Sequence, residues 1–270
     1  MSGHSQSDHI SQKRVVYATT GTEGVRVLKD HAYRVTDVTT LTMDLYYPSD
    51  SSETPRPAVI LVTGFPDKGV RQMVGCAPKE MGSYISWAQL IAASGMVAIT
   101  YANEDPARDV DSVLQYVREN AAVLEVDDSR MGVWACSGNV PNALSILTRG
   151  AQHRCRCAVL CYGYMLDFDG SSQVADAAAR FGFVNPCAGK SVDDLPRDVP
   201  LFIARAGRDQ MPGLNEAVDR FVVEALTRNL PITLVNHSAA PHAFDLFQDS
   251  EISREIIRQV LGFLRCYLAV

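Results

Sequence analysis

The sequence predicts an α/β sandwich in which helices cover both faces of a mostly parallel, twisted sheet. Short runs of continuously apolar residues carry this prediction: 58–62, 96–101, 131–135, 157–161, 201–206 and 232–235. Such runs are typical of parallel strands that are buried on both faces. Segments with the apolar spacing of helices lie among them, at 110–117, 214–225 and 252–264. Strands and helices alternating in this way place the ligand crevice at the carboxyl ends of the strands.

The start of the chain follows a different pattern. Apolar residues at 41, 43, 45 and 47 alternate with Thr42, Asp44 and Tyr46, as in a half-buried strand, and we expect residues 25–38 to pair with it antiparallel. Residues 1–14 are polar and lack the apolar core of a secretory signal, so we expect a flexible tail followed by a single domain over 15–270. The connection 162–199 is too long for a plain crossover and predicts a small lid insertion over the crevice.

The composition of the chain indicates which kinds of binding partner to expect. The 270 residues have a formal net charge of −6 without a block of like charges, which argues against a nucleic-acid or anionic membrane surface. The expected partner is a small molecule, and a homodimer is left open. No apolar run reaches the roughly 18 residues of a membrane helix. The seven scattered cysteines are an odd number, so a reducing cytoplasm is the expected location.

A candidate nucleophile follows the apolar run 131–135. Ser137 lies at a junction between this expected strand and a segment with helical spacing, which is the arrangement of a nucleophile elbow. The flanking positions of such a turn require small residues, and here they hold Ala135 and Asn139. Cys136 is the alternative nucleophile, but the shifted frame would place a bulky tryptophan at a small position. We therefore favour Ser137.

A candidate acid and base follow two later strands. Asp209 comes just after the run 201–206, where a carboxylate can hold an imidazole in one tautomer. His237 and His242 follow the run 232–235, and either can act as the base that accepts the serine proton. His242 is favoured because His237 still belongs to the end of the strand.

Oxyanion donors are expected at the end of the run 58–62. Gly64 permits a tight turn there, so the Phe65 N–H can join that of Gly138 in stabilising a tetrahedral intermediate. Aromatic and sulfur side chains near the strand ends are weaker candidates for the substrate pocket: Tyr84, Trp87, Tyr162, Tyr164 and Met211.

No cofactor is expected. The chain has neither of the common glycine-rich phosphate loops, which argues against a nucleotide enzyme. His153, Cys155, Cys157 and Cys161 lie near one another in sequence, but the last two fall in an expected buried strand, where a free cysteine behaves as a small apolar residue. We therefore expect no metal site.

Residues 41–264 resemble the α/β-hydrolases, in particular the dienelactone-hydrolase-like and carbohydrate-esterase-like branches. The resemblance rests on these segments: Asp44-Leu45-Tyr46-Tyr47-Pro48, Thr63-Gly64-Phe65, 126–132, the elbow, Gly207-Arg208-Asp209 and His242-Ala243-Phe244. It implies a metal-free hydrolase with the order Ser, acid, His, which acts through an acyl-enzyme.

The chain also departs from these relatives. Thr63 stands where many of them have histidine, the elbow lacks both usual glycines, and serine replaces the cysteine of true dienelactone hydrolases. The resemblance therefore favours a serine carboxylesterase for a small ester or lactone over dienelactone itself. Two alternatives stay open: a peptidase or acyltransferase with the same triad, and a catalytically silent binding protein on the same scaffold.

Overall fold

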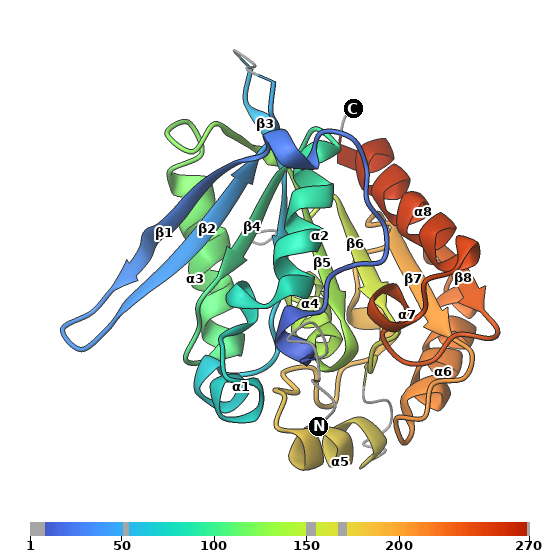
Figure 1. Ribbon diagram of the computed structural model, residues 1–270. Helices are drawn as coiled ribbons and strands as arrows, with labels where there is room; N and C mark the ends of the chain where they lie inside the picture. Colours follow the sequence, from blue (N-terminus) through green and yellow to red (C-terminus); the bar gives the residue numbers. More distant parts are fainter. Residues whose placement is uncertain (1–8, 51–53, 150–154, 167–171, 269–270) are drawn as a thin grey trace, which may run out of the picture.

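The computed structural model describes residues 9–50, 54–149, 155–166 and 172–268. Within these residues eight strands form one sheet in the order β1-β2-β4-β3-β5-β6-β7-β8 (Figure 1). They are β1 (Arg26–Val35), β2 (Thr40–Tyr47), β3 (Arg56–Leu61), β4 (Val97–Tyr101), β5 (Val126–Cys136), β6 (Cys157–Cys161), β7 (Leu201–Ala206) and β8 (Ile232–His237). β2 pairs antiparallel with β1 and β4, and all the other neighbours are parallel. The predicted sheet and the antiparallel pair at its start are confirmed.

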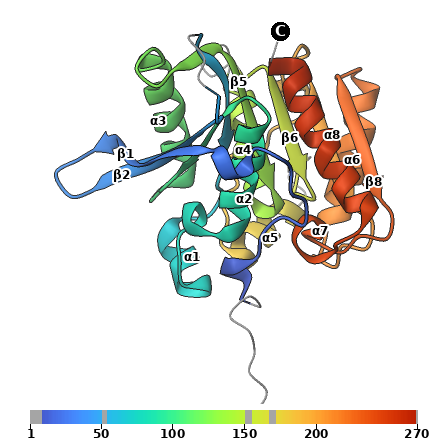
Figure 2. The ribbon, with the colours of Figure 1, turned by 45° about the horizontal axis from the view of Figure 1, so that its top comes forward.

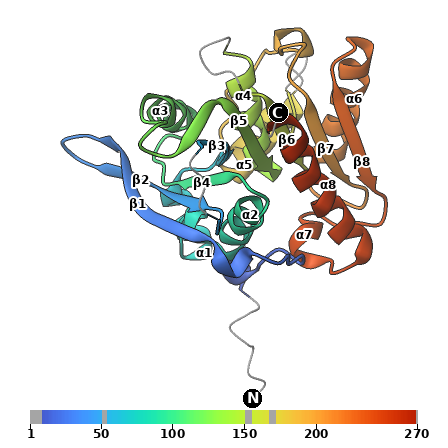
Figure 3. The same cartoon turned by 90° about the horizontal axis from the view of Figure 1, so that it is seen from above.

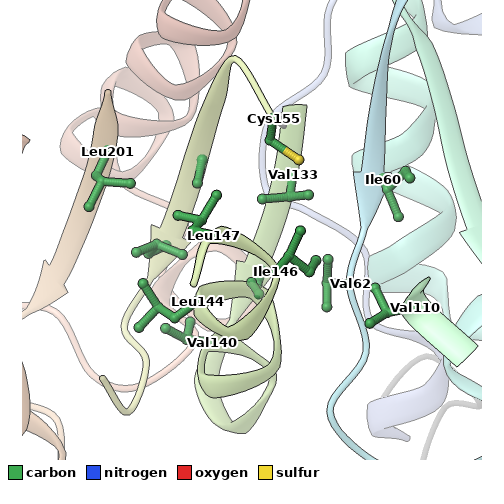
Figure 4. Close-up of a cluster of buried hydrophobic side chains, with 14 of the residues drawn as sticks. Ile60, Val62, Val110, Val133, Val140, Leu144, Ile146, Leu147, Cys155 and Leu201 are labelled. Atoms are coloured by element: carbon green, nitrogen blue, oxygen red, sulfur yellow. The ribbon is translucent and has the colours of Figure 1, made fainter. Parts of the chain in front are cut away.

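Helices cover both faces of this sheet, as predicted (Figure 3). Those described are α1 (Asp67–Val74), α2 (Gly82–Ala93), α3 (Pro106–Glu119), α4 (Val140–Leu147), α5 (Ser172–Phe181), α6 (Leu214–Thr227), α7 (Phe244–Phe247) and α8 (Glu251–Leu268). Because successive strand side chains point to opposite faces, Ile60 packs in one apolar core with α3, α4 and α6, while Leu61 packs in the other with α2 and α8. Figure 4 shows part of the first core, with Ile60 and Val133 of the sheet and Leu144 of α4 among the labelled side chains.

β5 begins earlier than the sequence predicts. The apolar run of this strand starts at 131, whereas the structure extends the strand back to Val126 through a bulge: the register with β3 passes from Arg56–Val126 to Ala58–Met131. Inside this bulge the Asp127 carboxylate accepts a hydrogen bond from the Ser129 amide at 3.0 Å. Asp127 therefore makes a local, turn-like hydrogen bond, while pairing with β3 continues the strand on both sides of the bulge.

The N-terminal segment is held against the α2 face. The short 3-10 helix η2 (Ile10–Gln12) is followed by chain that runs along α2 towards β1 (Figures 1 and 2). The Val15 amide donates to Ser86 Oγ at 3.0 Å, and the Val16 amide donates to the Asp245 carbonyl at 2.8 Å. The expected flexible tail over 1–14 is too long, because described residues of this stretch contact the domain: a Cβ on Gly82 would lie 2.8 Å from the Gln12 carbonyl oxygen, and Arg14 donates to Gln89 Oε1. Residues 1–8 lie outside the described residues.

Candidate active site

Ser137 occupies a sharp turn between β5 and α4. β5 ends at Cys136, and the single 3-10 turn η5 (Ser137–Asn139) leads directly into α4. Ser137 has a φ of 55°, a left-handed conformation that costs a non-glycine residue roughly 1–3 kcal/mol. Close packing holds it there: a Cβ on Gly163 would lie 2.1 Å from the Val140 side chain and 3.0 Å from the Ser137 carbonyl oxygen. This is the geometry of a nucleophile elbow.

Ser137, His242 and Asp209 form a continuous chain of hydrogen bonds. Ser137 Oγ lies 2.9 Å from His242 Nε2, and His242 Nδ1 lies 2.6 Å from Asp209 Oδ2. The Asp209 side chain is fully buried, and its second oxygen accepts from the Met211 amide at 2.9 Å. The carboxylate is therefore fixed in the orientation that holds the Nδ1–H tautomer of His242 and leaves Nε2 facing the serine.

Backbone hydrogen bonds join the loop of the acid to the loop of the base. The Gly207 amide donates to the His237 carbonyl at 2.9 Å, and the Arg208 amide donates to the Ala240 carbonyl at 2.8 Å. Gly207 is required for this contact, because a Cβ there would lie 2.6 Å from the Ser238 carbonyl oxygen. The Asp209–His242 pair therefore rests on main-chain contacts between the two strand ends.

The rival nucleophile, Cys136, lines the same cavity as Ser137, whereas the rival base, His237, lies elsewhere. Burial raises the pKa of the Cys136 thiol to about 12, which disfavours the reactive thiolate. His237 is buried, with its Nε2 3.3 Å from Ser253 Oγ and its ring edge-on to Phe244. The structure thus brings His242, and not His237, to Ser137.

A buried acidic group that was not predicted from the sequence lies beside the candidate triad. Both oxygens of the Asp245 carboxylate are bonded: Tyr162 Oη donates at 2.6 Å and Trp87 Nε1 donates at 2.8 Å. Burial raises the pKa of Asp245. The available signal was an acidic residue three positions after His242, which alone does not reveal its partners.

The expected oxyanion turn, Thr63-Gly64-Phe65, is held by hydrogen bonds on nearly every backbone group. The Thr63 N–H donates to Tyr101 Oη, and the Thr63 carbonyl accepts from Asn142 Nδ2 at 2.7 Å. The Phe65 carbonyl accepts from Asn103 Nδ2 at 3.2 Å.

The remaining backbone groups of this turn are those of Gly64 and the N–H of Phe65. The Gly64 N–H donates to Asn139 Oδ1 at 2.7 Å, and the Gly64 carbonyl accepts from the Val184 N–H at 2.8 Å. Among the described residues, the Phe65 N–H alone of the turn's backbone groups has no partner. It can therefore bind an oxyanion together with the Gly138 N–H, which lies in the first turn of η5, where amides have no intrahelical acceptor.

An apolar cavity of about 280 Å³ adjoins Ser137 and His242. Of the predicted pocket residues it includes Tyr84, Trp87 and Tyr162. Much of its wall was not predicted from the sequence. It comes from the N-terminal segment, α1, the following loop and α7: Ile10, Val70, Met73, Val74, Pro78, Met81, Leu246 and Phe247.

The other two predicted pocket residues lie outside this lining. Tyr164 is buried, stacks on Phe183 with 5.3 Å between ring centroids, and donates to the Pro212 carbonyl at 2.9 Å. Met211 is half-buried and packs on the apolar core of the α3 face. The prediction that Tyr164 and Met211 line the cavity is therefore wrong, because both side chains pack beside it.

The insertion 162–199 lies beside the elbow. Its Val184 amide bonds the oxyanion turn, and the Phe183 ring meets the Phe65 ring at 5.8 Å. Among its described residues, Tyr162 is the one that lines the cavity. Residues 167–171 lie outside the described residues, so closure by a lid stays a prediction.

The described residues hold no candidate metal site and no membrane-spanning helix. They contain no group of three or more His, Cys, Asp or Glu side chains placed to hold a metal ion. Cys155, Cys157 and Cys161 are buried free thiols, and His153 lies outside the described residues. No helix in the described part of the chain is long and apolar enough to cross a membrane.

Solved structures with the same fold are α/β-hydrolases and esterases, although no family model and no curated protein matches this chain. The α/β-hydrolase MGS-M1 from a Medee basin deep-sea metagenome aligns with a TM-score of 0.65 and 17% identity, covering 92% of this chain and 99% of that one. The esterase Est2 of Thermogutta terrifontis aligns with a TM-score of 0.65 and 18% identity, covering 92% and 95%. A thermostable esterase of Pseudomonas putida aligns with a TM-score of 0.68 and 14% identity, covering 93% and 86%.

These likenesses, together with the sheet order, establish that the chain has the α/β-hydrolase fold. The fold predicted from the sequence is confirmed. The dienelactone-hydrolase-like branch stays a prediction.

Proposed function

We propose that this protein is a serine hydrolase that cleaves a small carboxylic ester or lactone through an acyl-enzyme. The observation that carries the proposal is the chain of hydrogen bonds from Ser137 Oγ through His242 to Asp209, with contacts of 2.9 Å and 2.6 Å. This arrangement lets an otherwise weak hydroxyl lose its proton as it attacks.

In the acylation step, Ser137 Oγ attacks the substrate carbonyl carbon while His242 Nε2 takes the serine proton. Asp209 stabilises the imidazolium that forms, through its bond to Nδ1–H. The N–H groups of Phe65 and Gly138 bind the oxyanion, each worth roughly 3 kcal/mol of transition-state stabilisation. Collapse of the tetrahedral intermediate breaks the ester C–O bond, and the leaving oxygen takes the proton from Nε2.

In the deacylation step, water attacks the acyl-enzyme and gives its proton to His242 Nε2. The second tetrahedral intermediate then expels Ser137 Oγ, which recovers the proton and restores the free enzyme. With a lactone the alcohol and the acid stay in one molecule, so the product is a hydroxy acid.

The cavity supports a small, uncharged substrate. Its volume of about 280 Å³ and its wall of aromatic and aliphatic side chains favour a short apolar acyl or alcohol group. The esterases among the structures of the same fold agree with ester chemistry.

A fluorophosphonate probe and a panel of esters, lactones and amides test the proposal. We expect the probe to label the wild-type protein and not Ser137→Ala, and we expect esters or lactones to turn over faster than amides. Faster amide hydrolysis would indicate a peptidase. An unlabelled, inactive wild-type protein would indicate a binding protein on this scaffold.

A further inference from the structure

Asn139 fills the position two residues after the nucleophile, where the elbow pattern usually has glycine. Its side chain is buried, with 6% of the residue exposed. Asn139 Oδ1 accepts from the Gly64 N–H at 2.7 Å, while Asn139 Nδ2 faces Cys136 Sγ at 3.7 Å. One side chain thus bridges the elbow and the oxyanion turn.

The two segments that it joins are in backbone contact. A Cβ on Gly64 would lie 2.5 Å from the Gly138 carbonyl oxygen and 2.9 Å from Asn139 Cα. Each segment supplies one of the proposed oxyanion donors, Phe65 from the turn and Gly138 from the elbow. The relative placement of these two N–H groups therefore depends on the interactions that hold the turn against the elbow.

The Phe65 N–H is oriented by bonds on both peptides of Gly64. The N–H and C=O of a trans peptide point in opposite directions, so the bond from Val184 to the Gly64 carbonyl turns the Phe65 N–H the other way. The preceding peptide is held by the Gly64 N–H bond to Asn139 Oδ1 and by the bond from Asn142 Nδ2 to the Thr63 carbonyl. Loss of the Asn139 bond leaves a buried N–H without an acceptor and removes the one of these bonds that comes from the elbow.

We infer that Asn139 is a positioning residue, which couples the nucleophile elbow to the oxyanion turn and so aligns the two donors. This inference rests on the proposed function. It also explains how the elbow tolerates a residue larger than glycine, since the side chain fills a bonding role that glycine cannot.

The test compares Asn139→Gly and Asn139→Ala with wild type, using kcat and KM on one ester and the inhibition constant of a trifluoromethyl ketone. The ketone forms a tetrahedral adduct, so its affinity reports oxyanion alignment. We expect kcat to fall about 10- to 100-fold with KM within about twofold, and ketone affinity to fall by a similar factor as kcat/KM. Active-site titration normalises kcat to folded enzyme.

Asn120→Ala is the matched control, because it removes one side-chain bond, to the Tyr116 carbonyl at 2.9 Å, at the far end of α3. It should leave kcat unchanged. If Asn139→Gly is less stable because of added backbone freedom, Asn139→Ala still tests the inference. Wild-type kcat and ketone affinity in the folded variants would overturn it, even if their melting temperatures fell. An inactive, unlabelled wild-type protein would overturn the proposed function and this inference together.

Discussion

The ring of Tyr162 meets the ring of His242 edge to face, with 5.2 Å between their centroids. The hydroxyl of the same tyrosine donates to the buried carboxylate of Asp245. Tyr162 adopts a φ of 35°, a left-handed conformation that disfavours a side chain of this size. One strained residue at the end of β6 therefore confines the His242 imidazole and satisfies a buried acid.

Tyr162→Phe separates these two roles, because it keeps the ring and removes the hydroxyl. Asp245 would lose one of its donors in a buried site, so we expect the free energy of unfolding to fall by about 1–3 kcal/mol while kcat stays within a few-fold. Denaturant unfolding measures the first quantity and ester turnover the second. Tyr84→Phe is the control, since it removes only a 3.5 Å contact. Equal stability of the two variants would contradict the expected role of the hydroxyl.

The triad should behave as a unit under mutation. Ser137→Ala and His242→Ala should each lower kcat by about 10⁴-fold or more, and the double variant should be no worse than either. Steady-state kinetics with active-site titration checks this result. Cys136→Ala should retain most activity, because burial opposes its thiolate. An inactive Cys136→Ala with an active Ser137→Ala would shift the nucleophile by one residue.

Gly64→Ala should damage catalysis by a steric route. The new Cβ would lie 2.5 Å from the Gly138 carbonyl oxygen, which forces the oxyanion turn and the elbow apart. We expect kcat to fall about 100-fold, since displacements near 1 Å cost that much in a positioned site. Gly69→Ala is the control, because a Cβ there meets nothing within 4 Å. Comparable activity in both variants would contradict the close approach.

Ile10 should limit the length of the acyl group. It lines the cavity from the N-terminal segment, so Ile10→Ala should enlarge the site and raise kcat/KM for hexanoate esters relative to acetate esters by about three- to tenfold. A series of ester chain lengths measures the ratio. Ile252→Ala, at an exposed position of α8, should leave it unchanged. An unchanged ratio for Ile10→Ala would show that the segment does not bound the substrate.

Asp67 should make stability depend on pH. Burial raises its pKa from 3.8 to about 6, so the folded state holds this proton more tightly than the unfolded state and stability is lost as pH rises from about 4 to 6. Asp67→Asn removes that loss. The melting temperature of the variant should therefore rise relative to that of wild type between pH 4 and pH 7.

Asp50→Asn is the control of opposite sign, because a hydrogen bond from Arg56 lowers the pKa of Asp50. The melting temperature of this variant should fall relative to that of wild type as pH rises. The same trend in both variants would mean that burial does not govern Asp67.

Sequence patterns indicated the candidate triad because each member lies in the turn or loop after an apolar strand. Parallel strands end at one edge of the sheet, so Ser137 after β5, Asp209 after β7 and His242 after β8 were expected to converge there. The same reasoning placed Phe65 after β3. Local sequence carries this information, since strand ends and turns are read from neighbouring residues.

The cavity wall could not be predicted in this way. Trp87 and Asp245 are bonded across 158 positions of sequence, and Ile10 reaches the site from a segment that looked like a tail. Tyr164 appeared equally suited to the pocket, yet it stacks on Phe183 beside it. Such contacts depend on how separate loops pack, which no single stretch of sequence encodes.

The main-chain bonds between the loops after β7 and β8 tie the position of Asp209 to that of His242. β8 is the last strand of the sheet, with no neighbour on its outer side within the described residues. A displacement of this edge would carry acid and base away together and open the gap at Ser137, while the Asp209–His242 contact stays intact. A perturbation confined to that edge would therefore leave Ser137 without its base, although the Asp209–His242 hydrogen bond is still formed.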